Sequence, residues 1–255
     1  MKILICGHGF VGKAHGLFLS SHHDIKVYDP QLGYKDTTVF NDADAVIIAV
    51  STPEGEDGQC DMSNVYDTIE RIMPGTPVLI KSTVSLEGWR LINRAYPNEF
   101  ITFSPEYLRA DYAMEDFKNQ KSIAVGGGDV NLWVGILSES LEIRVDIMNP
   151  EVLILNKYFR NAFLAMKVAF FEQMYDMAIA SGVDPHELLA TVSDDKRIGK
   201  SHTYINTNDR GFGGHCFPKD TSALLATGHQ MGYDLSILSE AMQYNERLRN
   251  EKNNI

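Results

Sequence analysis

The chain has 255 residues, of which 44% are hydrophobic, so it can form one large or two small domains with a substantial core. Its formal net charge of −11 argues against nucleic acid or an anionic membrane surface as the main partner. No apolar run reaches the roughly 18 residues of a membrane span, and the apolar start is too short for a signal peptide. Three widely spaced cysteines indicate a reducing compartment, so we expect a cytoplasmic protein without a membrane or nucleic-acid partner.

The chain begins with a strand, a glycine-rich turn and a helix. Residues 2–6 are apolar, Gly7-His8-Gly9-Phe10-Val11-Gly12 follows, and a helical pattern covers residues 10–21. The glycines permit a tight turn and the close approach of a pyrophosphate, which the amino terminus of a helix attracts. The next strand ends in Asp29, whose carboxylate would bind ribose hydroxyls and repel the phosphate of NADP. This spacing predicts an NAD site; the competing interpretation is a structural turn in a domain that binds no nucleotide.

Strands and helices continue to alternate up to residue 149. The apolar run 45–50 is typical of a central parallel strand, and Ser51-Thr52-Pro53 follows it at the edge where such sheets bind ligands. A helix capped by Ser63 is expected to run to about residue 73. Further strand-like runs cover residues 78–81, 100–103, 122–126 and 143–147. The alternation predicts an α/β fold, a Rossmann-like, doubly wound and mainly parallel sheet of seven or eight strands.

The second half is predicted to be helical. Asn149-Pro150 is typical of a helix start, and the pattern continues to about residue 181, which is long for a globular protein. Lys157 and Asn161 share one face of this helix, although Lys157 alone could equally extend its amino group to water. The last helix, from about residue 235, has an apolar edge, and we expect no following domain to pack on it. We expect an NAD-binding domain over residues 1–149 and a helical domain over 150–255 that forms a homodimer.

One cysteine differs from the other two in its surroundings. Cys6 lies in the first strand and is expected to pack in the core, and Cys60 lies in a polar loop without an obvious partner. Cys216 follows the glycine-rich residues 211–214, which would let backbone approach a ligand, and directly precedes an expected helix. The helix start and the nearby Lys219 both favour a thiolate. Cys216 is therefore a candidate nucleophile, with a buried, inert cysteine as the alternative.

Taken in order, the motifs of this chain resemble those of the UDP-glucose/GDP-mannose dehydrogenase family. The series consists of Gly7-x-Gly9-x-x-Gly12, Ser51-Thr52-Pro53 with Asp57-Gly58 and Asp61, Lys81-Ser82-Thr83-Val84, Ser104-Pro105-Glu106-Tyr107-Leu108-Arg109, Lys157-x-x-x-Asn161-Ala162-Phe163-x-Ala165-x-Lys167, Arg197-Ile198-Gly199 and Gly211-Phe212-Gly213-Gly214-x-Cys216-Phe217-Pro218-Lys219-Asp220. The series spans nearly the whole chain, and its last motif is highly specific.

The resemblance implies a reaction, because the family oxidises the C6 alcohol of a nucleotide sugar to a carboxylate with two NAD⁺. By resemblance, the Cys216 thiolate adds to the aldehyde, and the resulting thiohemiacetal is oxidised to a thioester that water cleaves. Lys157 would stabilise the alkoxide and the oxyanion with help from Asn161. The candidates for the hydrolytic and base roles are Asp220, Thr83 and Glu106. Whether the general base is Lys157, Asp220 or Glu106 stays open.

The resemblance also implies two sets of ligand contacts. The residues expected to bind the cofactor are Gly7, Gly9, Phe10, Val11, Gly12, Asp29, Ser51, Thr52, Pro53, Ser82, Thr83 and Lys219. The residues expected to bind the nucleotide sugar are Glu106, Tyr107, Leu108, Arg109, Lys157, Asn161, Arg197, Ile198, Gly199, Phe212, Gly213, Gly214 and Cys216. No metal is expected.

Two departures from the family pattern bear on the substrate. We expect a short form without the family's C-terminal nucleotide-binding domain, and the segment between Asp29 and Asp42 is shorter than usual. UDP-glucose, giving UDP-glucuronate, is the expected substrate, while GDP-mannose and UDP-N-acetylmannosamine stay open as alternatives. A different class, a remnant that binds NAD or a nucleotide sugar without turnover, has no chemical need for all six catalytic candidates.

Overall fold

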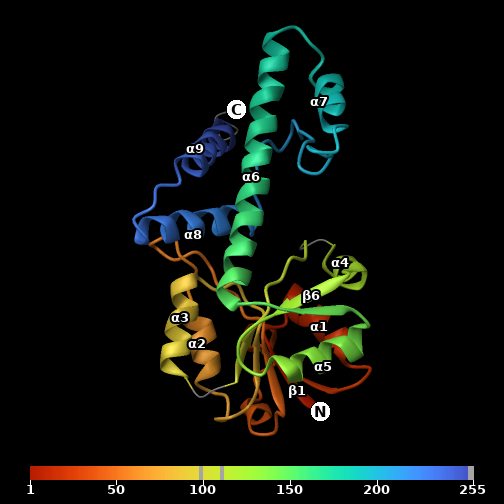
Figure 1. Cartoon of the computed structure of the whole chain (residues 1–255), viewed down its shortest axis with the longest axis vertical. Helices are drawn as coiled ribbons and strands as arrows, with labels where there is room; N and C mark the ends of the chain where they lie inside the picture. Colours follow the sequence, from red (N-terminus) through yellow and green to blue (C-terminus); the bar gives the residue numbers. More distant parts are fainter. Residues whose placement is uncertain (98–99, 110–111, 252–255) are drawn as a thin grey trace. The chain divides into compact units, whose positions relative to one another are not determined.

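A computed structural model describes residues 1–97, 100–109 and 112–251 of the chain (Figure 1). The chain forms two compact units. The first unit comprises Met1–Pro53 and Cys60–Lys157, and the second comprises Glu54–Gln59 and Tyr158–Ile255. Each unit has its own core and is described by itself. Within the described residues, no helix is both long and apolar enough to cross a membrane.

The first unit is built on a parallel five-stranded sheet with the order β2-β1-β3-β4-β5. The strands are β1 (Lys2–Cys6), β2 (Asp24–Tyr28), β3 (Ala45–Ile48), β4 (Val78–Ile80) and β5 (Ile101–Phe103). In the register of the central pairs, Ile3 lies opposite both Ile25 and Ala45. The four residues of β3 are all buried, as expected for a strand covered on both faces. The fold class predicted from the sequence is therefore confirmed.

Helices cover both faces of this sheet, as Figure 1 shows, with α1 and α5 on one side and α2 and α3 on the other. The helices of the first unit are α1 (Phe10–Leu19), α2 (Ser63–Ile69), α3 (Leu86–Ala95), α4 (Ala113–Asn119) and α5 (Val130–Leu141). Trp133 of α5 is fully buried in a core cluster with Ile3 and Ile5 of β1 and Leu19 of α1. The doubly wound arrangement thus follows from apolar residues on both faces of the central strands.

The expectation of one sheet of seven or eight strands is wrong, because the last two strands pair separately. Strands β6 (Ser122–Val125) and β7 (Arg144–Ile147) form a parallel two-stranded sheet of their own. An isolated antiparallel bridge joins Phe103 to Gly126. At Gly128, where φ is +48°, an added Cβ would lie 2.5 Å from the carbonyl carbon of Ile101. The chain therefore turns sharply against the end of the main sheet and does not extend it as a sixth strand.

The second unit is helical. Its elements are the greater part of α6 (Pro150–Ala180), α7 (Pro185–Ser193), α8 (Phe217–Gln230) and α9 (Ser236–Glu251). Asn149 Oδ1 accepts the N–H of Glu151 at 2.8 Å at the start of α6, and the Asp184 carboxylate caps α7. The bond at Asn149 confirms the helix start that the sequence predicts there. Phe212 packs against Ala165 and Ala169 of α6, forming one of the unit's small core clusters.

Two local expectations are wrong. Ser63 does not cap α2, because Ser63 is the first helical residue and the N-cap is Met62, which makes no side-chain cap bond. Oδ1 of Asp61 accepts the N–H of Ser63 at 2.9 Å just before the helix. The helix also ends at Ile69, before the expected residue 73. Cys60 is buried, with 4% of its surface exposed, although it follows a polar loop. Met62, two residues later, is buried as well. The chain therefore returns to the core directly after the polar loop, which the polar residues before Cys60 do not indicate.

Candidate active site

The three glycines of the turn after β1 differ in what surrounds them, so each has its own reason to be a glycine. Gly7 has φ +90°, and a Cβ there would lie 2.4 Å from the carbonyl oxygen of Ala49. A Cβ on Gly12 would lie 1.9 Å from the carbonyl oxygen of Gly7, so this glycine permits the close packing of α1 on β1. A Cβ on Gly9 would meet nothing within 4 Å. Packing within the protein therefore does not require Gly9, whereas close approach of a ligand to this backbone would.

The amino terminus of α1 suits an anion. Gly9 is the N-cap and supplies no side chain, and the first turn, beginning with Phe10 and Val11, holds no acidic residue. The backbone N–H groups at this end are therefore available to a pyrophosphate, which the helix dipole also favours. The residues present fit the dinucleotide that the spacing predicts.

Asp29 lies at the end of β2, beside this turn, as predicted. Its Oδ2 accepts the N–H of His8 at 2.7 Å, and its Oδ1 accepts those of Gln31 and Leu32 at 3.1 and 3.2 Å. Each carboxylate oxygen has two lone pairs, so Oδ2 retains one acceptor position for a ribose hydroxyl. The bonds also fix the carboxylate next to the turn. A role in holding NAD thus fits the geometry, and Asp29 has a structural role in addition.

Two polar segments follow neighbouring strands at the carboxyl edge of the sheet. Ser51, Thr52 and Pro53 come after β3, and Ser82 and Thr83 come after β4. Ser82 Oγ donates to the carbonyl oxygen of Val50 at 2.7 Å, which ties the two segments together. Asn64 of α2 donates to the carbonyl oxygen of Ser51 at 3.0 Å. This is the edge at which open α/β sheets bind their ligands.

A buried ionic cluster lies at the same edge. Lys81, at the end of β4, places its Nζ 3.2 Å from Oε2 of Glu106, which follows β5. The same ammonium donates to Ser104 Oγ at 3.0 Å and to the carbonyl oxygen of Pro105 at 3.3 Å. Lys157 of α6 donates to the backbone carbonyl of Glu106 at 2.9 Å and is 9% exposed, so its amino group does not extend to water. The structure therefore brings together Glu106 and Lys157, two of the expected catalytic residues.

Lys81 is the member of this cluster to which sequence reasoning gave no role. It is 2% exposed, and a lysine is almost never buried to this degree without a partner. The sequence does contain a signal for its burial, because Lys81 directly follows the buried apolar run Val78–Ile80. Lys81 is therefore the ion-pair partner of a candidate catalytic carboxylate.

The electrostatics of the cluster favour an ionised Glu106. Burial is the largest single influence and alone would raise the pKa of Glu106, but Lys81, His15, the N–H of Tyr107 and Lys157 together outweigh it, with Lys81 contributing most, and the pKa lies below its usual value. Burial lowers the pKa of Lys81, while Glu106 opposes this change. The nearby His15 is fully buried, and burial lowers its pKa to about 4. At neutral pH the cluster thus holds a carboxylate, a paired ammonium and a neutral imidazole.

The second unit holds the remaining catalytic candidates. Cys216 is exposed and is the N-cap residue of α8, whereas Cys6 and Cys60 are buried. In the first turn of α8, Asp220 is 1% exposed, and its carboxylate accepts from Asn161 Nδ2 at 2.6 Å and pairs with Lys219 Nζ at 2.8 Å. The structure therefore brings Asn161 and Asp220 together. Lys219, expected at the cofactor, here pairs with the buried carboxylate.

The expected sugar-nucleotide residues include two exposed arginines. The side chain of Arg197 is 88% exposed and pairs with Asp195 in the second unit, and that of Arg109 is 66% exposed and pairs with Asp116 in the first. Exposed ion pairs of this kind contribute little to stability, so either guanidinium can exchange its partner for a ligand phosphate. Beside Arg197, Lys167 Nζ donates to the carbonyl oxygens of Ile198 and Gly199 at 2.7 and 3.2 Å and fixes that turn.

The other expected sugar-nucleotide residues are divided between the units. In the first unit, the hydroxyl group of Tyr107 accepts from Asn156 Nδ2 at 2.9 Å, and Leu108 is half-buried. In the second unit, Gly213 and Gly214 precede Cys216, and Gly214 is exposed. Phe212 is 4% exposed, so its side chain belongs to the core and only its backbone remains for a ligand.

Comparison with known proteins identifies both units. Residues 31–133 match the NAD binding domain of the UDP-glucose/GDP-mannose dehydrogenase family, and residues 154–247 match its central domain. The chain belongs to this family. Its N-terminal domain is the family's NAD-binding domain, so NAD is the cofactor, as predicted.

Individual members of the family resemble the chain over most of its length. The UDP-glucose 6-dehydrogenase of Pseudomonas aeruginosa is 33% identical over 227 residues, which is 81% of this chain and 49% of that protein. The UDP-glucose 6-dehydrogenase YwqF of Bacillus subtilis is 30% identical and matches 96% of this chain and 66% of its own. A UDP-glucose dehydrogenase structure from the archaeon Pyrobaculum islandicum has a TM-score of 0.84 at 27% identity, covering 96% of this chain and 68% of that one. The chain spans about half the length of the first curated relatives it matches.

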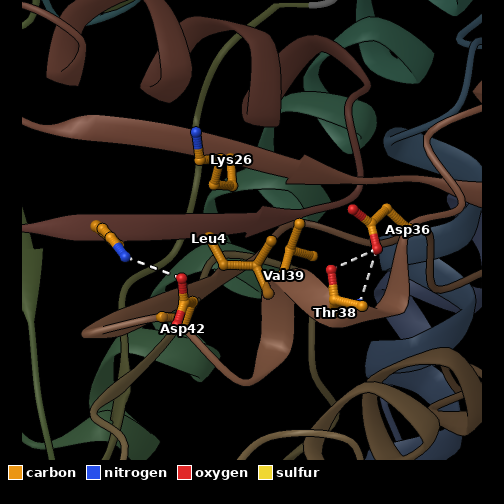
Figure 2. A pocket seen from close by; sticks show the side chains of 8 residues that line it. Leu4, Lys26, Asp36, Thr38, Val39 and Asp42 are labelled. Atoms are coloured by element: carbon orange, nitrogen blue, oxygen red, sulfur yellow. Dashed lines mark hydrogen bonds and ion pairs between the residues drawn. The ribbon is translucent and has the colours of Figure 1, made fainter.

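A separate pocket, of about 290 Å³, lies beside β1, β2 and the segment that precedes β3 (Figure 2). It is lined by Lys2, at the start of β1, and by Thr38 and Asp42, which precede β3. The short segment between β2 and β3 forms two 3₁₀ turns, Pro30–Leu32 and Thr37–Phe40. Ligands of parallel sheets bind at the carboxyl ends of the strands, so this pocket is not the cofactor site.

Proposed function

We propose that this protein is an NAD-dependent nucleotide-sugar dehydrogenase that oxidises UDP-glucose to UDP-glucuronate by removing four electrons. The observation that carries the proposal is the state of the three cysteines. Cys6 and Cys60 are buried, whereas Cys216 is exposed at the start of α8, four residues before a buried carboxylate. The names of the relatives from Pseudomonas aeruginosa and Bacillus subtilis support UDP-glucose as the substrate.

The cofactor would be held by residues at the carboxyl edge of the sheet. The glycines of the first turn and the amino terminus of α1 would bind its pyrophosphate, and Asp29 would accept a ribose hydroxyl. Ser51, Thr52 and Pro53, together with Ser82 and Thr83, would line the same edge. Bound NAD⁺ supplies the hydride acceptor for each of the two oxidations.

The side chains of the protein would carry the remaining chemistry. Loss of a proton and a hydride converts the C6 alcohol to an aldehyde. The Cys216 thiolate then attacks the aldehyde carbon, so a C–S bond forms and the carbonyl electrons become an alkoxide that the Lys157 ammonium stabilises. Loss of the second hydride leaves a thioester. Water adds to the thioester, the thiolate leaves, and a carboxylate and the free Cys216 side chain result.

The choice of general base among Glu106, Lys157 and Asp220 can be narrowed from the contacts that each residue makes. Glu106 is ionised at neutral pH, because Lys81 and its other neighbours hold its pKa low despite burial, so its carboxylate carries no proton and has lone pairs that can accept one. Lys157 donates one N–H to the Glu106 carbonyl, and its amino group has further N–H donors that suit oxyanion stabilisation. Asp220 is held by Asn161 and Lys219 and would order the hydrolytic water. We therefore assign the base role to Glu106, with Thr83 assisting hydrolysis.

The substrate can be tested with a panel of sugar nucleotides. NADH formation would be followed at 340 nm with UDP-glucose, GDP-mannose and UDP-N-acetylmannosamine, with Cys216→Ala as the test variant and Cys60→Ala as the control. NADH from UDP-glucose with the wild type and Cys60→Ala supports the proposal. A folded protein that binds NAD but reduces none of it with any of the three sugars would contradict it and would favour a binding protein without turnover.

We also propose that the helical unit forms a homodimer. The exposed fractions of Phe163 and Phe170 on α6 are 62% and 54%, and that of Ile237 on α9 is 79%. These side chains border a pocket of about 640 Å³ on the second unit. A large exposed apolar surface of this kind is typical of an interface. Light scattering coupled to gel filtration would test it: Phe163→Asp should give a monomer where the wild type gives a dimer, and a monomeric wild type would refute the proposal.

A further inference from the structure

A side-chain amide on α9 binds the backbone of the loop that precedes Cys216. Asn245 Oδ1 accepts the N–H of Phe212 at 2.7 Å, and Asn245 Nδ2 donates to the carbonyl oxygen of the same residue at 3.0 Å. Asn245 is 7% exposed, so both bonds are shielded from water. A carboxamide carries the donor and the acceptor that this pairing needs, whereas a carboxylate can only accept.

A buried carboxylate on α6 binds Gly211, the residue that precedes Phe212 in the loop. Glu172, 2% exposed, accepts the N–H of Gly211 through Oε1 at 2.6 Å. Its Oε2 pairs with Arg210 at 2.6 Å, and the same guanidinium pairs with Asp176 at 2.7 Å. Two helices therefore hold two consecutive residues of the loop through charged or bidentate bonds.

The sequence of the loop fits this restraint. Gly211 has φ +79°, and a Cβ there would lie 2.4 Å from Oδ1 of Asn245, so the amide occupies the space that a side chain would need. The Phe212 side chain is buried with Ala165 and Ala169 of α6. Gly211, the first glycine of the loop, therefore makes room for the side chain of Asn245 on α9. The sequence analysis had explained this glycine by the approach of a ligand. Gly214 differs, because a Cβ there would meet nothing within 4 Å.

Cys216 lies midway between two restrained points. Phe212 lies four residues before it and is bound to Asn245. Asp220 lies four residues after it and is bound to Asn161. The segment between Phe212 and Cys216 contains Gly213 and Gly214, which resist bending little. Without the bonds to Asn245 and Glu172, the backbone that precedes the nucleophile would be held mainly by the packing of the Phe212 side chain.

We propose that Asn245 and Glu172 are positioning residues for Cys216, acting through the backbone of Phe212 and Gly211. The proposal rests on the proposed function, in which Cys216 must meet a carbonyl carbon with a defined orientation. Neither side chain is required to touch the substrate. They restrict the conformations of the loop, so that the thiolate is presented in one place.

The test uses the full chain with variants on α9 and α6. Asn245→Ala removes both bonds, Asn245→Asp keeps the acceptor for the Phe212 N–H and loses the donor, and Glu172→Gln keeps the acceptor and loses the charge. Asn250→Ala is the matched control, because Asn250 is an exposed asparagine on the same helix. Hydrogen exchange read by mass spectrometry would follow peptides that span residues 211–216, and iodoacetamide labelling would follow Cys216 against Cys60.

The expected result is specific to the loop. Asn245→Ala should speed exchange in the 211–216 peptides by about tenfold and change the labelling rate of Cys216 by several-fold, with Asn250→Ala matching the wild type. Asn245→Asp should retain slow exchange at the Phe212 N–H while altering the labelling of Cys216. If Asn245→Ala fails to fold, Asn245→Asp and Glu172→Gln carry the same comparison. Wild-type exchange and labelling in all the folded variants would overturn the proposal.

Kinetics separate positioning from mere support of the fold. In a chain that turns over UDP-glucose, Asn245→Asp should lower kcat about tenfold or more with KM and the unfolding midpoint little changed. An equal loss of activity and of unfolding midpoint would contradict positioning. If the wild type forms no NADH with any sugar, the proposed function fails, but exchange and labelling still decide whether Asn245 and Glu172 hold the loop.

Discussion

Replacing Lys81 by methionine removes the charged partner of Glu106 and keeps the apolar volume of the lysine stem. The two side chains are 1% and 7% exposed, so no water can take the place of the ammonium. Breaking a buried ion pair by removing one partner costs about 3–5 kcal/mol, because the other charge is left uncompensated. We expect a loss of this size in the free energy of unfolding at pH 8.

The dependence on pH distinguishes this cause from a packing defect. In the wild type the pKa of Glu106 is lowered, so its contribution to stability is present above the unfolded pKa of about 4.5 and is lost as the pH falls through the folded value. In Lys81→Met the largest influence that opposes burial is gone, so the pKa of Glu106 should rise. The variant should therefore lose stability as the pH rises from 4.5 to 8, whereas the wild type should not.

Urea unfolding at pH 5 and pH 8 measures both effects. Lys26→Met is the control, because the Lys26 side chain is 51% exposed and pairs with Asp24 at the surface. The double variant Lys81→Met, Glu106→Gln should recover part of the loss, since it leaves no buried charge without a partner. A Lys81→Met protein with the stability of the Lys26→Met control, or with the same loss at both pH values, would refute the reasoning.

Three further predictions concern other parts of the two units. Gly12→Ala should lower the unfolding midpoint, since its Cβ would lie 1.9 Å from a backbone oxygen, whereas Gly9→Ala should fold normally and weaken NAD binding in calorimetry. His15→Leu should reduce acid sensitivity: the folded pKa of His15 is about 4, below its unfolded value of about 6.5, so the wild type loses up to about 3 kcal/mol as the pH falls between these values. Asn161→Asp should place a second carboxylate against Asp220, and thermal melts should show it less stable at pH 8 than at pH 5; equal melts would contradict this.

The strands and the long helix could be predicted because their signals are local. Continuous apolar runs predicted β3 and β4, and Asn149 predicted the start of α6. Sheet pairing could not be read in the same way. Whether Ser122–Val125 joins the main sheet depends on the sharp turn at Gly128 against β5, which is a contact between segments far apart in sequence.

The candidate site shows the same limit. Glu106 and Lys157 were predicted from motifs, but the role of Lys81 follows only from the distance between the ends of two neighbouring strands. The role of Asn245 could not be predicted either, because the sequence of α9 does not indicate that one of its side-chain amides binds the backbone of Phe212. Cys60 was predicted in a polar loop from its neighbours, and its burial depends on how the chain returns to the core after that loop. Local sequence thus predicts which groups are present, and tertiary contacts decide which of them are paired.

The measurement that tests the central claim most directly is the number of NADH molecules formed per UDP-glucose consumed, with a trap for free aldehyde present. Covalent catalysis by Cys216 predicts two NADH per sugar, UDP-glucuronate as the product and no trapped aldehyde, with Cys216→Ala failing at the second oxidation. One NADH per sugar with aldehyde in the trap, or full turnover to the acid in Cys216→Ala, would contradict the thioester route.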